Sequence, residues 1–215
     1  MALRGDGGDE NFFGYITFDA YYLALKLKKI FPSFILRFIK KLTNLTPISH
    51  DYITFSTKIR KFFNSINLKN NHLLPAWMGC LNADDMGNLF NEKFSNNDIY
   101  EDAEEMFEGN INLMRGAQLY YFKFYLPLVL SMVDQASMLN SVESRSPFLS
   151  KKIINFSLDY DINALYKIFQ KKHFIKKVFK KIIPKHILKV KKHGFALPKN
   201  IILENKDLIN NLIDK

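Results

Sequence analysis

The sequence has little cysteine, tryptophan, proline or glycine, and these shortages exclude several kinds of protein. Its 215 residues include one cysteine, one tryptophan, seven prolines and nine glycines. A single thiol cannot form an internal disulfide, which favours a reducing compartment and hence a cytoplasmic location. Sparse proline and glycine leave no recognisable linker, so we expect residues 1–215 to belong to one domain, whole or in large part.

Long apolar runs and metal-ligand patterns are also missing. The longest apolar stretches, 30–39 and 120–133, are interrupted by Arg37, Lys123 and two prolines, and they fall short of the roughly 20 apolar residues of a membrane span. The first residues lack the basic and apolar segments of a secretion signal. The five histidines share no ligand spacing with one another or with the cysteine, so no zinc site is expected. The sequence therefore predicts no membrane partner.

The sequence is rich in hydrophobic residues and has more basic than acidic residues. Hydrophobic residues make up 47% and aromatic residues 14%, as in ordinary globular proteins. The chain carries 31 Lys and Arg against 21 Asp and Glu, a formal charge of +10. This charge favours an anionic partner such as a nucleotide, pyrophosphate or nucleic acid. A biased genome composition is the alternative explanation, because the excess is mostly lysine in a chain also rich in asparagine and isoleucine.

Helical periodicity dominates the hydrophobic pattern. Five segments carry apolar residues at three-and-four spacing: 15–30, 75–90, 113–140, 151–158 and 171–183. In the last of them the apolar residues form one stripe and the lysines take the opposite side. This pattern predicts a surface helix with its apolar side inward, ended by Pro184.

Helix ends and strands can also be predicted. Asn82, followed by two aspartates, is expected to cap a helix, and Pro127 to lie in the first turn of a buried helix that runs to about residue 140. The strand candidates are few, namely the end of a strand at 1–3 and a short strand at 52–55. The visible chain is therefore predicted to be mainly α.

The first motif that can carry chemistry is Gly5-Asp6-Gly7-Gly8-Asp9-Glu10. Glycines allow backbone angles at which successive amides turn toward an anion, while neighbouring carboxylates hold a cation. Such a loop at the start of a helix suits magnesium-bound phosphates. A tight acidic turn is the alternative. A calcium loop is excluded because asparagine and aromatic residues follow Glu10, where alternating ligands are required.

The second motif spans residues 134–149. Polar residues end an apolar helix, and Glu143 and Arg145 follow on an extended stretch before Pro147. Taken alone, the residues favour a structural network between Glu143 and Arg145 that fixes the turn, because such pairs more often organise structure than react.

The third motif is the stretch 190–198, where Lys191 and Lys192 precede a glycine hinge. A lysine there can set its ammonium group against pyrophosphate or a developing oxyanion. In a lysine-rich chain a solvated surface pair is the more common reading. Spacing alone does not decide between them.

In this order, the three motifs resemble the synthetase domain of the glutamine-hydrolysing asparagine synthetase family, which includes β-lactam synthetases and amidotransferases of surface-polysaccharide clusters. The resemblance covers nearly the whole chain, including the helical stretches 74–90 and 118–127. It implies a mainly α chain with one or two short strands, the helical C-terminal portion of an α/β adenine-nucleotide domain of the ATP pyrophosphatase (HUP-like) type.

The resemblance also implies a reaction. In the family a carboxylate, most commonly that of aspartate, attacks the α-phosphate of ATP and gives an acyl-adenylate and pyrophosphate. Ammonia, released from glutamine by a separate glutaminase domain, then displaces AMP. The implied cofactors are ATP and Mg²⁺, and the implied partners are small molecules.

Site residues follow from the resemblance by position. Asp9 matches the magnesium-binding aspartate, and Asp6 an acidic residue that takes a proton from the attacking amine. Lys192 matches the lysine that stabilises charge during both steps, and Lys172 a basic residue near the phosphates. The complete implied set is Asp6, Glu143 and Lys192 for catalysis, Gly5, Gly7, Gly8, Arg145 and Lys172 for ATP, and Asp9 for the metal.

Parts of the family pattern are absent from this sequence. It contains no Ser-Gly-Gly-x-Asp-Ser loop, which cradles pyrophosphate in the family, and no glutaminase domain with a leading cysteine. We therefore expect a partial gene product, a remnant, or a split enzyme whose other chain supplies both parts, and no amide formation by this chain alone. Arg4 and Phe13 replace small residues of the family and are expected to crowd the glycine loop, and Val190 and Ser150 replace a common arginine and aspartate.

A different class of function is a non-catalytic basic helical module that binds an anionic partner through the face 171–192. Nucleic acid is one such partner, although not the expected one. The module reading as a whole leaves the glycine and acid loop unexplained.

Overall fold

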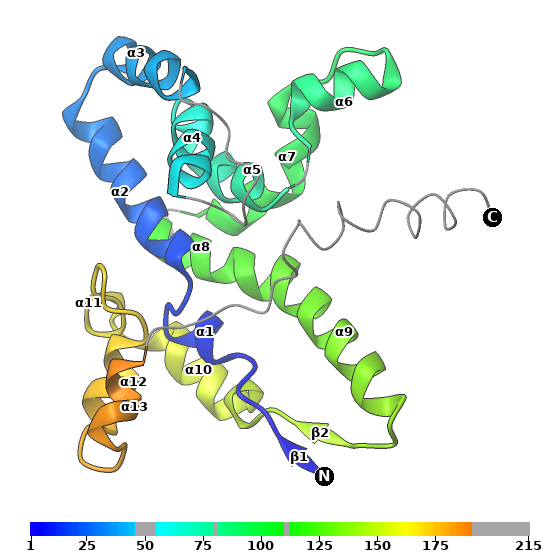
Figure 1. The fold of residues 1–215 in the computed structure, drawn as a ribbon, viewed down its shortest axis with the longest axis vertical. Coiled ribbons are helices and arrows are strands. Elements are labelled where there is room, and N and C mark those ends of the chain that lie inside the picture. Colours follow the sequence, from blue (N-terminus) through cyan, green and yellow to red (C-terminus); the bar gives the residue numbers. More distant parts are fainter. Residues whose placement is uncertain (46–54, 80, 110–111, 191–215) are drawn as a thin grey trace.

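The computed structural model describes residues 1–45, 55–79, 81–109 and 112–190. Within them the chain is mainly helical, with two short strands (Figure 1). The α-helices are α1 (Gly8–Asn11), α2 (Ile16–Ile30), α3 (Ser33–Asn44), α4 (Phe55–Ser65), α5 (Leu73–Met78), α6 (Ala83–Phe90), α7 (Asn96–Glu104), α8 (Leu113–Tyr120), α9 (Leu126–Met138), α10 (Lys151–Asp159), α11 (Ile162–Leu165), α12 (His173–Val178) and α13 (Lys185–Lys189). Short 3₁₀ turns lie at Asn70–His72, Glu105–Phe107 and Pro147–Leu149, and one π-helical turn at Tyr121–Tyr125 joins α8 to α9.

The helices form two groups that share a central pair (Figure 1). Helices α3 to α7 gather at one end of α2, while α1 and α10 to α13 gather near its other end. Helices α2 and α8 contact each other between the groups. Helix α9 continues the line of α8 away from both groups and leads to the strands.

The two strands pair in parallel. In β1 (Ala2–Leu3) and β2 (Ser144–Arg145), Ala2 lies opposite Ser144 and Leu3 opposite Arg145. The predicted strand at 1–3 and the predicted extended stretch through Arg145 are therefore confirmed. The candidate strand at 52–55 is wrong at Phe55, which begins α4, and its other residues lie outside the described part. The expectation of a mainly α chain with few strands is confirmed, while the larger α/β sheet stays a prediction.

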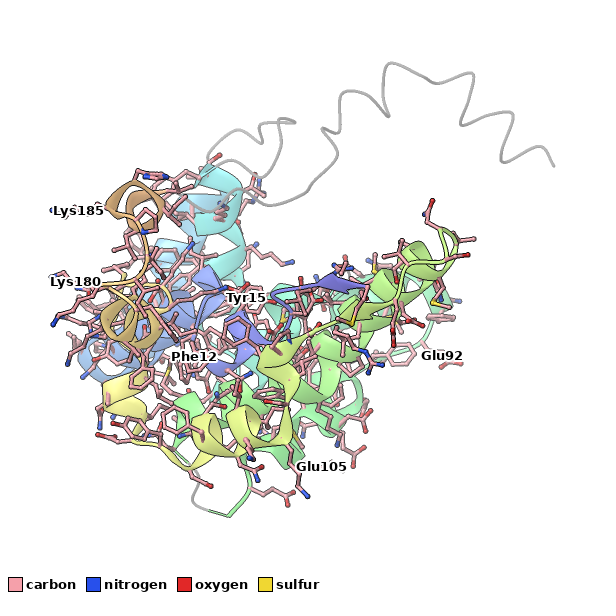
Figure 2. The ribbon with its side chains drawn as sticks, turned by 90° about the horizontal axis from the view of Figure 1, so that it is seen from below. Phe12, Tyr15, Glu92, Glu105, Lys180 and Lys185 are labelled. Carbon is pink, nitrogen blue, oxygen red and sulfur yellow. The ribbon has the colours of Figure 1, made fainter. Side chains whose placement is uncertain are left out.

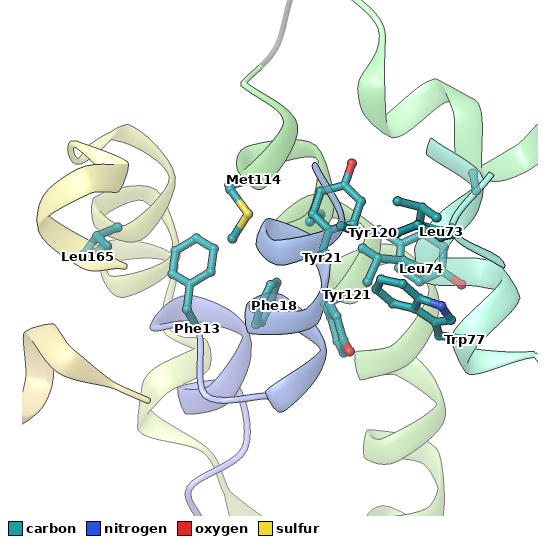
Figure 3. Close-up of a cluster of buried hydrophobic side chains, with 14 of the residues drawn as sticks. Phe13, Phe18, Tyr21, Leu73, Leu74, Trp77, Met114, Tyr120, Tyr121 and Leu165 are labelled. Atoms are coloured by element: carbon teal, nitrogen blue, oxygen red, sulfur yellow. The ribbon is translucent and has the colours of Figure 1, made fainter. Parts of the chain in front are cut away.

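The core is rich in aromatic rings because α2, α5 and α8 all turn such side chains inward (Figure 3). Phe18 and Tyr21 of α2 are fully buried, as expected for residues three apart on one helical face. Phe18 lies against Tyr121, with ring centroids 4.7 Å apart. Burying an aromatic side chain stabilises the fold by roughly 2 to 3 kcal/mol relative to exposure, so this cluster holds the two helical groups together.

The predicted cap at Asn82 is confirmed, but the predicted helix 75–90 is two helices. The Asn82 side chain accepts from the Asp85 backbone N–H at 2.9 Å, and Asp85 Oδ2 accepts from the Asn82 N–H at 3.1 Å. This reciprocal pair starts α6. Gly79 has an extended conformation and ends α5 before it.

The predicted helix 171–183 is shorter than expected. It begins at His173, because Lys172 has a left-handed backbone with φ 53°, and it ends at Val178. Lysines four apart repel each other on a helix, and Pro184 disfavours helical geometry at the residue before it. Pro184 instead precedes α13. The apolar stripe faces the core only in part, since Ile182 is 76% exposed.

The expectation that Pro127 opens a buried helix is half wrong. Pro127 does lie in the first turn of α9. However, Leu126 is the one residue of the helix that is buried within the described part of the chain. Across the described residues, no helix combines the length and the apolar character needed to cross a bilayer.

Candidate functional site

The glycine loop connects β1 to α1 and depends on Gly7. Gly7 has φ 84°, which a residue with a side chain rarely adopts. A Cβ at Gly7 would also overlap the side chain of Leu149, whose Cγ would lie at 2.8 Å. Gly7 then accepts a hydrogen bond from the Asn11 backbone N–H at 2.9 Å, so the loop closes directly onto α1.

The loop is held by buried amide side chains. Asn11 Nδ2 donates to the carbonyl oxygen of Gly7 at 2.6 Å and to that of Phe148 at 3.0 Å. Gln118 Nε2, from α8, donates to the carbonyl oxygen of Asn11 at 3.1 Å and to that of Glu10 at 3.2 Å. Elements far apart in sequence thus fix the backbone of one short segment.

Sequence reasoning missed the residues that hold the loop. Ser157 of α10 completes the set by donating its hydroxyl to Asn11 Oδ1. The available signal was that Gln118 and Ser157 are polar residues next to apolar positions of amphipathic helices, where a buried polar group needs a partner.

Asp9 and Lys172 meet at the end of the loop. Lys172 Nζ lies 3.1 Å from Asp9 Oδ1, and both side chains are partly exposed. Gly14 makes room for this pair, because a Cβ there would overlap Asp9 Oδ1 and lie 2.7 Å from Lys172 Cε. The structure therefore brings together two residues that are 163 positions apart in the sequence.

The other loop acids point elsewhere. Glu10 is buried and accepts a hydrogen bond from the Tyr15 hydroxyl at 2.6 Å. Burial raises the pKa of Glu10, while the bond from Tyr15 opposes that rise. Asp6 Oδ2 pairs with Arg4 Nε at 3.1 Å and accepts from the Ser146 hydroxyl at 3.2 Å. The expectation that several carboxylates converge on one cation is therefore wrong.

A single carboxylate still fits magnesium. Among the described residues, no three acidic, histidine or cysteine side chains are close enough to hold a metal without other ligands. Mg²⁺ commonly takes one or two protein carboxylates and completes its shell with substrate phosphates and water. Asp9 can fill that role beside phosphate groups, provided that the Lys172 ammonium moves from the carboxylate.

Asp9 and Lys172 line an open cleft of about 980 Å³. Four more lysines line it: Lys171, Lys176, Lys177 and Lys180. Between residues 162 and 190 the sequence has nine lysines and no acidic residue. Figure 2 shows Lys180 and Lys185 on one flank of the molecule, well separated from Glu92 and Glu105. The cleft is therefore strongly basic, with Asp9 as the acid in its lining.

His173 also lines the cleft, among these lysines. Its pKa is lowered, mainly by burial and further by the positive charges of Lys167 and Lys177. Because several lysine ammonium groups lie together in the cleft, an anion entering it would relieve the repulsion among them.

The remaining implied residues lie outside this lining or outside the described part. Glu143 and Arg145 form an ion pair with each other on the surface at β2, and neither they nor Asp6 line the cleft. Their pairing agrees with the structural network expected from the residues alone. Lys192 lies outside the described residues, and Val190 is among the residues that line the cleft.

The expected crowding by Phe13 does not occur. Phe13 has φ 53°, a left-handed conformation that favours glycine, which accounts for a glycine at this place in the family. Its ring leaves the loop and packs in the core, 4.8 Å from the ring centre of Phe18 and 5.4 Å from that of Tyr166. Burial offsets a backbone strain of roughly 1 to 2 kcal/mol.

The comparisons with known proteins confirm the family. The family model described as asparagine synthase matches residues 1–215, so the chain belongs to the asparagine synthase family. The chain is 26% identical over 233 residues to asparagine synthetase [glutamine-hydrolyzing] 1 of Bacillus subtilis (strain 168). That match covers 100% of this chain and 34% of the relative. No solved structure matches the chain.

Proposed function

We propose that the chain is a fragment or split subunit of an ATP-dependent amidotransferase of the asparagine synthase type, with residues 1–215 forming part of its synthetase domain. The observation that supports this most is the meeting of Asp9 and Lys172 in a lysine-lined cleft, 3.1 Å apart. An acid that can hold magnesium and lysines that can hold phosphates suit the pyrophosphate end of ATP.

Each residue has a distinct part in this proposal. Asp9 would hold Mg²⁺, and the ion would neutralise the negative charge that develops on pyrophosphate during adenylation. Lys172 leaves Asp9 and pairs with a phosphate, and Lys192 stabilises charge during both steps. Asp6 accepts a proton from the attacking amine. The buried amide network keeps the glycine loop in place while these groups act.

The glycines and the pair at β2 complete the site. Gly5, Gly7 and Gly8 present the loop backbone to the phosphates, and the φ of 84° at Gly7 turns that backbone. Glu143 and Arg145 pair with each other and organise the turn, and the next residue, Ser146, donates a hydrogen bond to Asp6.

The substrates follow the family. The proposed carboxylate is aspartate, and the amine is ammonia released from glutamine in the cytoplasm. A separate chain supplies the glutaminase and the remaining ATP contacts. The chain alone is accordingly expected to release no pyrophosphate when given aspartate, ATP, magnesium and ammonia.

A hybrid enzyme tests the proposal. This chain replaces the matched region of the Bacillus subtilis relative, and pyrophosphate and asparagine are measured with aspartate, ATP, magnesium and ammonia. We expect turnover that Asp9→Asn or Lys172→Ala reduces at least roughly 100-fold, a loss within the range for removing one charge-stabilising group. Lys185→Ala is the matched control, because this lysine belongs to α13 and does not line the cleft. A folded hybrid without turnover, or one in which Lys172→Ala behaves like Lys185→Ala, would contradict the proposal.

The alternative is a basic helical module that binds an anionic partner, and the nine lysines between residues 162 and 190 favour it. Such binding would weaken steeply with salt and ignore nucleotide identity. A magnesium-dependent preference for ATP over single-stranded nucleic acid at 150 mM salt would exclude this alternative.

A further inference from the structure

Helix α3 carries a row of large apolar side chains that point away from the protein. Phe34, Phe38 and Leu42 recur every four residues, and they are 64%, 67% and 57% exposed. Residues at this spacing lie on one side of a helix. Leu36, on the other side, is buried and belongs to the core. Because a helix of a globular protein usually turns its apolar side inward, the outward row of α3 points to a partner.

Basic side chains border the apolar row of α3. Arg37 follows Phe34 by three positions, and Lys41 follows Phe38 by three, so each lies beside an apolar residue on the helix surface. Both Arg37 and Lys41 are exposed. Long basic side chains can lay their apolar stems along such a row while their charged ends reach outward. One side of α3 thus presents apolar groups and positive charges together.

The sequence around α3 is basic over a long stretch. Between residues 20 and 83 it has ten Lys and Arg and one acidic residue, Asp51. This stretch contains α3, α4 and most of α2. Lys29 at the end of α2 and Lys58 and Lys61 of α4 are exposed. A negatively charged partner would therefore be attracted to this whole part of the molecule.

Helix α3 lies far from the candidate site. In Figure 1 it is at the end of the molecule opposite to the strands and to α12 and α13. Among the described residues that line the lysine cleft, none belongs to α3. A partner on α3 would therefore leave the cleft open.

We propose that α3 attaches the protein to the surface of a bilayer that contains anionic lipids. The helix lies parallel to the surface, with Phe34, Phe38 and Leu42 among the acyl chains. Arg37 and Lys41 lie at the lipid phosphates. An apolar side of Phe and Leu bordered by Lys and Arg is typical of helices that bind at this depth.

Surface attachment of this kind needs no membrane-spanning helix. The sequence-based expectation of no membrane partner rested on the lack of a span and of a secretion signal, and attachment through α3 departs from it. The attachment is also independent of the proposed function, because it uses neither the glycine loop nor the lysine cleft.

The combination of apolar row and basic border favours a bilayer over other anionic partners. Nucleic acid would pair with Arg37 and Lys41 through its phosphates, but it would leave the apolar row in water. An acidic protein would need pockets shaped for Phe34 and Phe38. A bilayer uses both features without such pockets, because acyl chains take the apolar side chains and lipid phosphates take the basic ones.

Sedimentation of the full chain with lipid vesicles tests the attachment. The probe is phosphatidylcholine vesicles with roughly 30% phosphatidylglycerol, compared with vesicles of phosphatidylcholine alone. We expect at least roughly tenfold tighter binding to the anionic vesicles, and a loss of at least roughly tenfold when Phe34→Ser and Phe38→Ser are combined. Arg37→Ala should weaken binding roughly fivefold at low salt, as expected for one basic residue near the lipid surface.

Helix α6 supplies the matched control. Phe90 is 56% exposed there, close to the exposure of Phe34 and Phe38, but the first turn of α6 carries Asp84 and Asp85. Phe90→Ser should therefore leave vesicle binding unchanged. Circular dichroism checks that each variant is folded, which we expect because the substituted side chains are exposed.

Fluorescence locates the inserted side chain directly. Phe38→Trp and Phe90→Trp each add one indole to the chain, whose own tryptophan is Trp77. With bromine on the acyl chains of the anionic vesicles, the Phe38→Trp variant should lose more fluorescence than the unmodified chain. The Phe90→Trp variant should lose no more than the unmodified chain.

Three other results would overturn the attachment. The first is a folded chain that does not bind the anionic vesicles, which would leave an acidic protein as the partner of α3. The second is binding that survives the combined Phe34→Ser and Phe38→Ser change but is lost with Lys176→Ala and Lys180→Ala, since the lysine cleft would then hold the lipid. The third is self-association without vesicle binding that Phe38→Ser abolishes, which would make a second copy of the chain the occupant.

Discussion

The two sides of the cleft are built in different ways. The acidic side, residues 5–14, is held by two buried amide side chains, Asn11 of α1 and Gln118 of α8, which are bonded to its backbone. The basic side, residues 171–180, consists of the six-residue helix α12 and turns whose lysines face solvent. The Lys172 and Asp9 ion pair links the two. The acidic side is therefore fixed by bonds within the chain, whereas we expect the basic side to gain stability from an anion.

Removing the main clamp of the acidic side should have the largest effect on stability. Asn11→Ala leaves the carbonyl oxygen of Phe148 without this donor and removes the side-chain bonds of Asn11 to Gly7 and Ser157. The Gly7 carbonyl keeps its bond from the Asn11 backbone N–H. We expect a loss of about 3 kcal/mol in the free energy of unfolding, since each unsatisfied buried group costs roughly 1 to 3 kcal/mol. Urea unfolding measures it. The control Asn140→Ala removes one exposed bond to Ala136 and should change stability by less than roughly 0.5 kcal/mol.

Filling the space beside the ion pair should have the next largest effect. Gly14→Ala introduces a methyl group that overlaps Asp9 Oδ1, so the pair with Lys172 must separate. Overpacking of this kind typically costs about 1 to 3 kcal/mol. Gly5→Ala is the matched control, because a Cβ there meets nothing within 4 Å. Equal stability of the two variants in urea would show that Asp9 is not confined by Gly14.

The buried Glu10 predicts a smaller effect that depends on pH. Burial raises its pKa in the folded state above the ordinary value of 4.5. The folded state then binds a proton more tightly than the unfolded state, so this contribution to stability is full below pH 4.5 and is lost as pH rises through the raised value. Glu10→Gln keeps an acceptor for the Tyr15 hydroxyl and has no carboxyl to titrate. Its urea midpoint relative to the unmodified chain should therefore be higher at pH 7 than at pH 4.5. A relative midpoint that does not change with pH would contradict the account.

A substitution on the basic side should change the free energy of unfolding least. Lys176 is exposed on α12, so Lys176→Ala should leave the free energy of unfolding within roughly 0.5 kcal/mol of the unmodified chain. It should weaken pyrophosphate binding by roughly threefold at low salt, the size expected of one exposed charge pair. This difference should shrink at 300 mM salt, because exposed charges are screened. A large loss of stability would mean that the lysine side is clamped like the acidic side.

The elements that depend on local signals were predictable from the sequence. The periodicity of 15–30 and 151–158 and the cap at Asn82 correspond to α2, α10 and the start of α6. Periodicity failed at 171–183, because repulsion between lysines and a left-handed Lys172 act against a helix that the apolar stripe favours. Periodicity also predicted that α9 is buried, although most of it is exposed. Apolar residues indicate that a helix favours burial, but they do not indicate what covers it.

The site was predictable only in part. The residues of the glycine loop were found from their local pattern, and Lys172 was named through the family resemblance. Its contact with Asp9 depends on how α12 packs, which no local pattern contains. The clamps Gln118 and Ser157 were missed because a single buried polar residue has no spacing signature. The division of labour among Asp6, Asp9 and Glu10 likewise follows from their three-dimensional partners.

The most direct test of the central claim is the affinity of the chain for pyrophosphate with and without magnesium, measured by titration calorimetry. The claim is that Asp9 holds the metal while the lysines hold the phosphates. It predicts that magnesium strengthens binding at least tenfold and that Asp9→Asn removes this gain, while Asp161→Asn at the start of α11 keeps it. Equal affinity with and without magnesium, or an unchanged magnesium effect in the Asp9→Asn variant, would contradict it.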